Sequence, residues 1–299
     1  MSLGLGIGTP FQPVLSSSGF LLDEVSGAVA GWSFRKLRAA YSGNAVRIRA
    51  DRTGQPESDF GFTAAGVFDT AAAESWLAGD DGYLVTWYDQ VSSNDQTQST
   101  AADQPLIASA GSFETGSHGL PVANSSANNR AMDLPDLTNS GAVTNQTIFG
   151  IVEVAVVSTN HNLLGGGTGD GSFNSQYGWN AWKVKFSTAF RWGTRDAIFT
   201  DVPVANTAVI MGTHSVDGGS PVYVEARING SDSALLSAAT SDSFGCHIIG
   251  NTATGGENPM QAGGEAQPKW AELVVWNSDK FDGSEATIEA NMNAYASIY

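Results

Sequence analysis

Aromatic and amide side chains gather between residues 177 and 192, where their chemistry suits a sugar ligand. Aromatic rings cover the apolar faces of sugars, while amide and carboxylate groups bond the hydroxyls. On an extended strand, Trp182 and Val184 share one face, and Lys183 and Lys185 share the other. Filling of a sheet-sheet core by the tryptophans is the alternative, and the sequence leaves both open. The candidate ligand-binding residues are Tyr177, Trp179, Asn180, Trp182, Arg191 and Trp192.

Other catalytic or metal-binding patterns are weak. The glycine-rich segment 165–171 lacks the lysine and the following helix of a phosphate-binding loop. Asp170 within it is a candidate Ca²⁺ ligand, because Ca²⁺ prefers oxygen ligands, and a plain wide loop is the alternative. We therefore expect no cofactor, with Ca²⁺ left open. The histidines are scattered without metal-ligand spacing, at His118, His161, His214 and His247.

The charge of the chain restricts its partners. The 299 residues carry a net charge of −16, and this field repels nucleic acid and anionic membrane surfaces. No stretch approaches the ~20 apolar residues that span a bilayer, so we expect no membrane insertion. The first ten residues lack a basic residue and a long apolar run, so we expect no signal peptide and synthesis in the cytoplasm. Cys246 is the one cysteine and excludes an intrachain disulfide.

Strand and turn signals dominate the sequence. It contains 35 glycines and only 15% charged residues, which disfavours long helices. Helical potential concentrates in residues 37–76 and in the tail, with short helices predicted at 71–77, capped by Asp69 or Thr70, and within 284–299. We expect an all-β, two-sheet jelly-roll sandwich over residues 20–299, after an extension at 1–19 that is either an assembly peptide or a frayed terminus. Strands are predicted at 83–88, 106–107, 120–122, 146–154, 182–186, 207–214, 222–230, 246–250 and 269–276.

Residues 33–110 carry a series of short patterns that resembles a known family. This series resembles the N-terminal half of the catalytic domain of family 54 α-L-arabinofuranosidases. It is also similar to concanavalin A-like (laminin G-like) domains, many of them in bacteriophage tail and virion proteins. The resemblance implies a concanavalin A-like sandwich, in which we interpret Trp87–Gln90 as an architectural corner rather than a site. The patterns are Ala40–Gly43, Val46–Arg49, Phe60–Phe62, Gly66–Asp69, Val85–Gln90, Asn94–Asp95, Thr97–Gln98 and Gln104–Pro105.

The carboxylates that this resemblance implies are not at the matching positions. A retaining glycosidase needs two carboxyl groups about 5 Å apart. In the enzymes resembled, the nucleophile is a Glu on a central strand after a cysteine pair, and the acid is an Asp after a Gly near the penultimate strand. The corresponding segments, 177–192 and 250–252, contain neither Asp nor Glu, and the cysteine pair is absent. Catalysis is therefore the secondary hypothesis, in which Asp170, Glu225 or Glu257 would supply the carboxyl pair instead.

The leading hypothesis from the sequence is a bacteriophage virion component of the tail, fibre or head decoration. Its sandwich would bind a host-surface glycan, and its other partners would be neighbouring virion proteins. Cytoplasmic synthesis, the glycine-rich leader and the resemblance over residues 33–110 motivate this hypothesis, and virion symmetry implies a homo-oligomer. The alternatives are a glycoside hydrolase of arabinofuranosidase type and a structural virion protein without a ligand.

Overall fold

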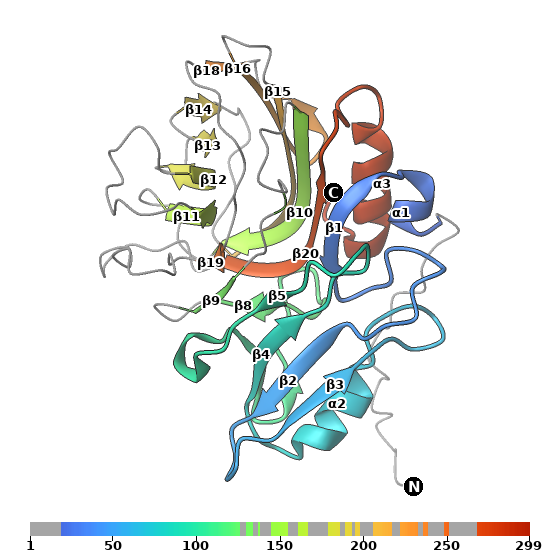
Figure 1. The fold of residues 1–299 in the computed structure, drawn as a ribbon, viewed down its shortest axis with the longest axis vertical. Coiled ribbons are helices and arrows are strands. Elements are labelled where there is room, and N and C mark those ends of the chain that lie inside the picture. Colours follow the sequence, from blue (N-terminus) through green and yellow to red (C-terminus); the bar gives the residue numbers. More distant parts are fainter. Residues whose placement is uncertain are drawn as a thin grey trace, which may run out of the picture.

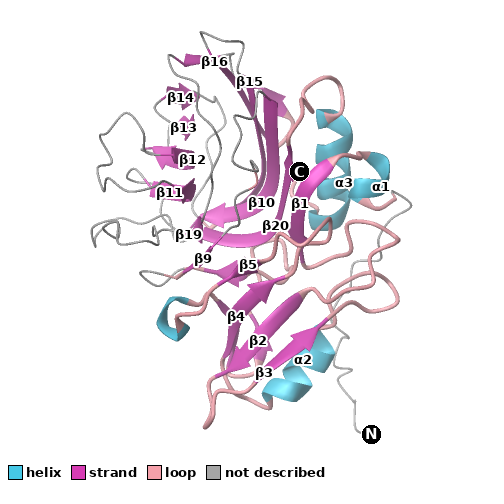
Figure 2. Cartoon of the chain, viewed as in Figure 1, coloured by secondary structure: helices cyan, strands magenta, loops and turns pink. Residues whose placement is uncertain are grey.

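The computed structural model describes residues 19–125, 130–133, 137, 145–154, 161–166, 179–185, 189–192, 195–197, 206–216, 222–232, 236–238, 248–250 and 268–299. Between 161 and 197, and at 236–238 and 248–250, it describes the backbone alone. Strands and loops make up most of the described chain, and the helices are few and short (Figure 2). The strand pairings of the described residues are all antiparallel, which confirms the predicted all-β sandwich.

The first sheet is centred on two long strands that lie side by side in the chain's interior (Figure 1). Its strand order follows from the pairings, and two short strands extend it beyond β16. Its strands are β1 (Ala28–Ser33), β20 (Pro268–Trp276), β10 (Asn145–Val154), β15 (Ala208–Val216) and β16 (Val222–Ile228), followed by β17 (Ser231–Asp232) and β18 (Leu236–Ala238).

The second sheet runs as one series of paired strands from β3 to β14. In this order its strands are β3 (Glu57–Phe60), β2 (Val46–Ala50), β4 (Gly82–Trp87), β5 (Gln96–Thr97), β9 (Ala131–Asp133), β19 (Ile248–Gly250), β11 (His161–Gly166), β12 (Trp179–Lys185), β13 (Ala189–Trp192) and β14 (Arg195–Ala197). Three short strands, β6 (Leu106–Ser109), β7 (Ser112–Phe113) and β8 (Ala123–Asn124), connect β4 to β20.

Both faces of the first sheet are buried, because each covers a different apolar cluster. Alternation along β10 places Ile148 and Val152 in the cluster between the sheets, and Phe149 and Ile151 in the cluster on the opposite face. Helices α1 (Leu21–Glu24) and α3 (Glu285–Ala296) cover that opposite face (Figure 1). Gly212, the register partner of Phe149, leaves room for the phenyl ring, since any side chain there would collide with it.

Most predicted elements are present. Helix α2 (Thr70–Leu77) is capped by Asp69, whose carboxylate accepts from Ala72 N at 3.1 Å. The Asn229–Gly230 turn that closes the β16 hairpin has positive φ at both residues, as an Asn-Gly hairpin turn requires. Of the described helices, none is long and apolar enough to cross a membrane.

Two predictions about elements were wrong. The strand predicted at 120–122 is only an isolated bridge between Thr115 and Pro121, and the strand begins at Ala123. Proline has no N–H to donate to a ladder, which explains the shift. Helical potential was also overestimated before Thr70, because β2 and β3 occupy part of that region. Arginines alternate with apolar residues along β2, where Arg47 is partly exposed and Arg49 is buried.

Candidate functional site

Two neighbouring strands of the second sheet carry most of the predicted ligand-binding residues. Trp179, Asn180 and Trp182 belong to β12, and Arg191 and Trp192 belong to β13. The two strands pair, with Lys183 as the register partner of Arg191. The side chains of these residues lie outside the described part of the structure, so their sugar-binding role stays a prediction. Tyr177 and Asp170 lie wholly outside the described residues.

Strand β11 brings together the two segments in which the arabinofuranosidase resemblance implied carboxylates. It pairs with β12 on one side and with β19 on the other. Leu164 is the register partner of both Trp182 and Ile249, so the two segments are separated by a single strand. Strands β11, β12, β13 and β19 contain no Asp or Glu, so any catalytic carboxyl group must come from elsewhere.

Two aspartates lie on described strands that border this group. Asp196 lies on β14 and is the register partner of Arg191 on β13. Asp133 lies on β9 and is the register partner of Ile248 on β19 and of Thr97 on β5. Its side chain is half-buried. Glu225, one of the predicted substitutes, lies instead on the first sheet. Its carboxylate is 3.7 Å from His214 Nδ1, on the face that α3 covers.

A second polar group lies on the same sheet at strands β3 and β2. The Arg47 guanidinium donates twice to Asp59, from Nε to Oδ1 at 2.7 Å and from Nη2 to Oδ2 at 2.9 Å. Tyr88, directly after β4, donates its hydroxyl to Asp59 Oδ1 at 2.8 Å. The Arg47 and Asp59 side chains are 41% and 31% exposed, so solvent reaches the group. Sequence reasoning missed this group, although the alternation along Val46–Arg49 was a signal for it.

The carboxylates around Tyr88 have opposite pKa shifts. Hydrogen bonds from Arg47 lower the pKa of Asp59. Burial raises the pKa of Asp95, which accepts from Asp89 N at 2.8 Å. Burial also raises the pKa of Tyr88 to about 12, helped by the hydrogen bond to Asp59.

Within the segment Trp87–Gln90, the side chains of Trp87, Asp89 and Gln90 are architectural, as the sequence predicted, whereas the Tyr88 side chain joins the exposed group at Asp59. Trp87 is fully buried. The buried Asp89 carboxylate accepts from four backbone N–H groups at 2.8–3.2 Å, those of Gly31, Val91, Ser92 and Asn94. Gln90 donates to the carbonyls of Ser33 and Arg35 and accepts from Leu37 N. These bonds hold the loop after β4 against β1.

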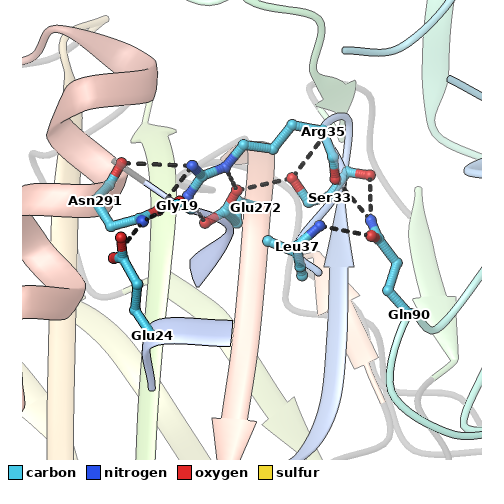
Figure 3. A network of polar contacts seen from close by, with 8 residues as sticks. All are labelled: Gly19, Glu24, Ser33, Arg35, Leu37, Gln90, Glu272 and Asn291. Atoms are coloured by element: carbon cyan, nitrogen blue, oxygen red, sulfur yellow. Dashed lines mark hydrogen bonds and ion pairs between the residues drawn. The ribbon is translucent and has the colours of Figure 1, made fainter. Parts of the chain in front are cut away.

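A buried ionic network joins β1, β20 and α3 (Figure 3). Arg35 binds Glu272 twice and donates from Nη1 to Asn291 Oδ1 at 2.8 Å. Ser33 Oγ donates to Glu272 Oε2, and Asn291 Nδ2 donates to Glu24 Oε2. Glu272 is inaccessible to solvent, so no substrate reaches this carboxylate and the network is structural.

The histidines lack a metal-binding arrangement in the part of the chain that is described. There, no three His, Cys, Asp or Glu side chains are placed to hold a metal ion. His118 Nδ1 accepts from Leu120 N, and burial lowers the pKa of this imidazole to about 4. His214 is buried against Phe281 with Asp279 Oδ1 at 3.3 Å. His247 lies outside the described residues.

Solved structures of arabinofuranosidases have a similar fold. An arabinofuranosidase complexed with arabinofuranosyl-α-1,2-xylobiose aligns at a TM-score of 0.59 and 16% identity, covering 92% of this chain and 64% of that chain. A family 54 α-L-arabinofuranosidase soaked with a cyclic sulfate inhibitor aligns at 0.59 and 14% identity, covering 90% and 63%. A Trypanosoma rangeli sialidase aligns at 0.49 and 11% identity, covering 95% and 36%. No protein-family model and no curated protein matches the chain.

These comparisons correct the function predicted from the sequence. The two arabinofuranosidases that align with the chain at a TM-score of 0.59 are glycosidases, and neither points to a bacteriophage virion. At 14–16% identity the likeness to the arabinofuranosidases establishes the fold. The sequence ranked virion assembly first because the concanavalin A-like sandwich occurs in both classes, and a shared fold does not fix function. The chain spans less than two thirds of the arabinofuranosidase chains it matches.

Proposed function

We propose that this chain is a glycoside hydrolase that removes arabinofuranosyl groups from a glycan, with its site on the second sheet around β11, β12 and β19. The observation that carries this proposal is the arabinofuranosidase fold, which extends over 92% of the chain at a TM-score of 0.59. The pairing of β11 with both β12 and β19 supports the location, because it joins the segments that correspond in position to the family's carboxylate-bearing strands.

The proposed site combines aromatic residues for binding with a carboxylate for catalysis. The tryptophans of β12 and β13 supply ring surface for sugar faces. Glycoside hydrolysis needs one carboxyl group to protonate the leaving oxygen and a second to attack the anomeric carbon or to activate water. Asp133, at the register position beside β19, is our candidate for one of them. Asp170 and Glu257, outside the described residues, are the candidates for the other.

The charge of the chain indicates the class of glycan. A net charge of −16 repels anionic polymers at low ionic strength. A neutral arabinose-bearing polysaccharide avoids this repulsion, whereas a polyuronate does not. The proposed substrate is therefore a neutral glycan such as arabinoxylan.

Hydrolysis of 4-nitrophenyl α-L-arabinofuranoside by the purified chain tests the proposal. We expect nitrophenol release from the wild type, a loss of at least about a hundredfold with Asp133→Asn, and wild-type rates with Glu57→Gln. Glu57 is the matched control because it is an exposed carboxylate on β3 of the same sheet. Full activity of Asp133→Asn would remove Asp133 from the mechanism. Absence of release by the folded wild type, from this substrate and from arabinoxylan, would overturn the proposed function.

A further inference from the structure

We propose that Arg47, Asp59 and Tyr88 form a second, non-catalytic subsite that binds adjacent hydroxyls of a neutral glycan chain. That one glycan chain reaches from the catalytic strands to this subsite rests on the proposed function. That the three residues bind a glycan is independent of the proposed function. Side chains from β2, β3 and the loop after β4 meet here, far from β11 and β12 in strand order.

The three side chains are held in place but keep unused hydrogen-bonding capacity. Arg47 Nη1 makes no hydrogen bond within the described part of the chain, since the guanidinium contacts Asp59 through Nε and Nη2. Asp59 Oδ2 accepts one bond and has a further lone pair, and the Tyr88 hydroxyl donates to Asp59 and can still accept. A donor and two acceptors are thus fixed side by side, which suits a pair of vicinal hydroxyls.

An aromatic pair lies on the segments that flank β2 and β3. Tyr41 and Phe62 pack edge to face at 6.1 Å, and both are half-buried. The Tyr41 hydroxyl donates to Asn44 O at 2.7 Å, and Tyr88 N donates to the carbonyl of the next residue, Ala45, at 2.9 Å. Half-exposed rings beside oriented polar groups are the combination that sugar binding uses.

The geometry of the pair is closely defined. The two-point contact of Arg47 with Asp59 is further oriented by the Tyr88 hydroxyl, while both side chains of the pair stay partly exposed. Tyr83, on the outer part of the same sheet, gives a contrast. Its ring lies under the guanidinium groups of Arg49 and Arg130, at 4.6 and 5.2 Å from the centroid, so its ring surface is already occupied.

The register of the second sheet connects this subsite to the proposed catalytic strands. Asp59, Arg47, Thr86, Thr97 and Asp133 are successive cross-strand partners from β3 to β9. Cross-strand partners share a face of a sheet, and four strand spacings of ~4.8 Å give roughly 19 Å between the ends of this row. Thr86, the middle member of the row, is buried, and Thr97, the neighbour of Asp133, is exposed. A glycan chain, rather than a single sugar, is needed to reach from one end to the other.

Affinity electrophoresis in gels containing arabinoxylan tests the subsite. We expect the wild type to be retarded, and Tyr88→Phe and Asp59→Asn to bind about tenfold more weakly, because each loses a hydrogen bond involving a charged group. Glu57→Gln, two residues from Asp59 on the same strand, should run as the wild type. Thermal melts must show that all variants are folded. The subsite would be overturned if arabinoxylan retarded both Tyr88→Phe and Asp59→Asn as strongly as it retards the wild type.

Two further results separate the subsite from the proposed function. Binding of arabinoxylan that depends on Tyr88 and Asp59, without release of nitrophenol from 4-nitrophenyl α-L-arabinofuranoside or of arabinose from arabinoxylan, would support the subsite and overturn the hydrolase. If the wild type releases nitrophenol but is not retarded by arabinoxylan, the hydrolase is supported and the subsite is overturned. Retardation by anionic polygalacturonate as strong as by arabinoxylan would contradict the neutral-glycan specificity.

Discussion

Arg35 and Glu272 form a two-point ion pair in the interior of the protein. Arg35 Nε lies 2.7 Å from Glu272 Oε2, and Nη2 lies 2.8 Å from Oε1, with the two side chains 2% and 0% exposed. Burial by itself would lower the pKa of Arg35, but the charge and hydrogen bonds of Glu272 outweigh it and raise the pKa. The Tyr295 ring of α3 lies against the guanidinium at 4.7 Å. The pair therefore fastens α3 to the first sheet.

Removing one partner of this pair is expected to be costly. Arg35→Met or Glu272→Leu leaves a buried charge without its counter-ion, which destabilises a fold by about 3–5 kcal/mol. The double substitution should cost less than the sum of the two single ones, because no isolated charge remains. Urea denaturation of the three variants measures this difference. Additive losses, or single losses below about 1 kcal/mol, would contradict the structural role.

Asp89 should be equally hard to replace. Asp89→Ala leaves the N–H groups of Gly31, Val91, Ser92 and Asn94 without their acceptor. Each unsatisfied buried donor costs about 1–3 kcal/mol, so we expect a loss of at least about 3 kcal/mol. Asp89→Asn keeps one acceptor oxygen and should lose less. Chemical denaturation measures the stabilities of the two variants. An alanine variant as stable as the asparagine variant would contradict the role of Asp89 in holding the loop after β4.

His118 should make stability depend on pH in the mildly acidic range. Burial lowers its pKa from 6.5 to about 4 in the folded chain. The unfolded chain therefore takes up a proton first as the pH falls. The stabilisation is fully present above about pH 6.5 and is lost as the pH falls toward 4, by on the order of 2–3 kcal/mol.

His118→Asn isolates this contribution. An asparagine oxygen can still accept from Leu120 N, as His118 Nδ1 does, but it does not titrate. The free energy of unfolding of the wild type should fall more between pH 7.5 and 4.5 than that of the variant. Equal losses in the two proteins would show that His118 is not responsible.

Trp182→Ala tests the predicted ligand-binding strand β12. If its ring binds sugar, the variant should remain folded and lose about tenfold or more in affinity for arabinoxylan. If the ring instead fills the core, the variant should lose about 3–5 kcal/mol of stability. Affinity electrophoresis and urea denaturation on the same preparation distinguish sugar binding from core packing. An unchanged affinity together with an unchanged stability would exclude both roles.

Elements whose sequence pattern lies within the element itself were predicted well, and those without such a pattern were not. The long strands β10 and β20 were found because their apolar runs are continuous, and β16 because an Asn-Gly turn follows it. The strand displaced from 120–122 to Ala123 shows that a proline outweighs neighbouring apolar residues. Helix α1, four residues long, has too little sequence to carry a signal.

The polar groups were harder to predict because their partners are distant in the chain. Arg35 and Glu272 are 237 residues apart, and no single-sequence pattern pairs them. Asp59 and Tyr88 meet only because β3 and β4 both flank β2. Function was misjudged for a different reason. The sequence pattern identified a fold that several activities share, so it did not choose between them.

The most direct test of the central claim is the release of arabinose from arabinoxylan by the purified wild-type chain, measured by chromatography of the products. The proposed hydrolase predicts free arabinose that accumulates with time and is lost with Asp133→Asn but not with Glu57→Gln. A folded chain that releases no arabinose over a long incubation, at any pH between 4 and 8, would contradict it.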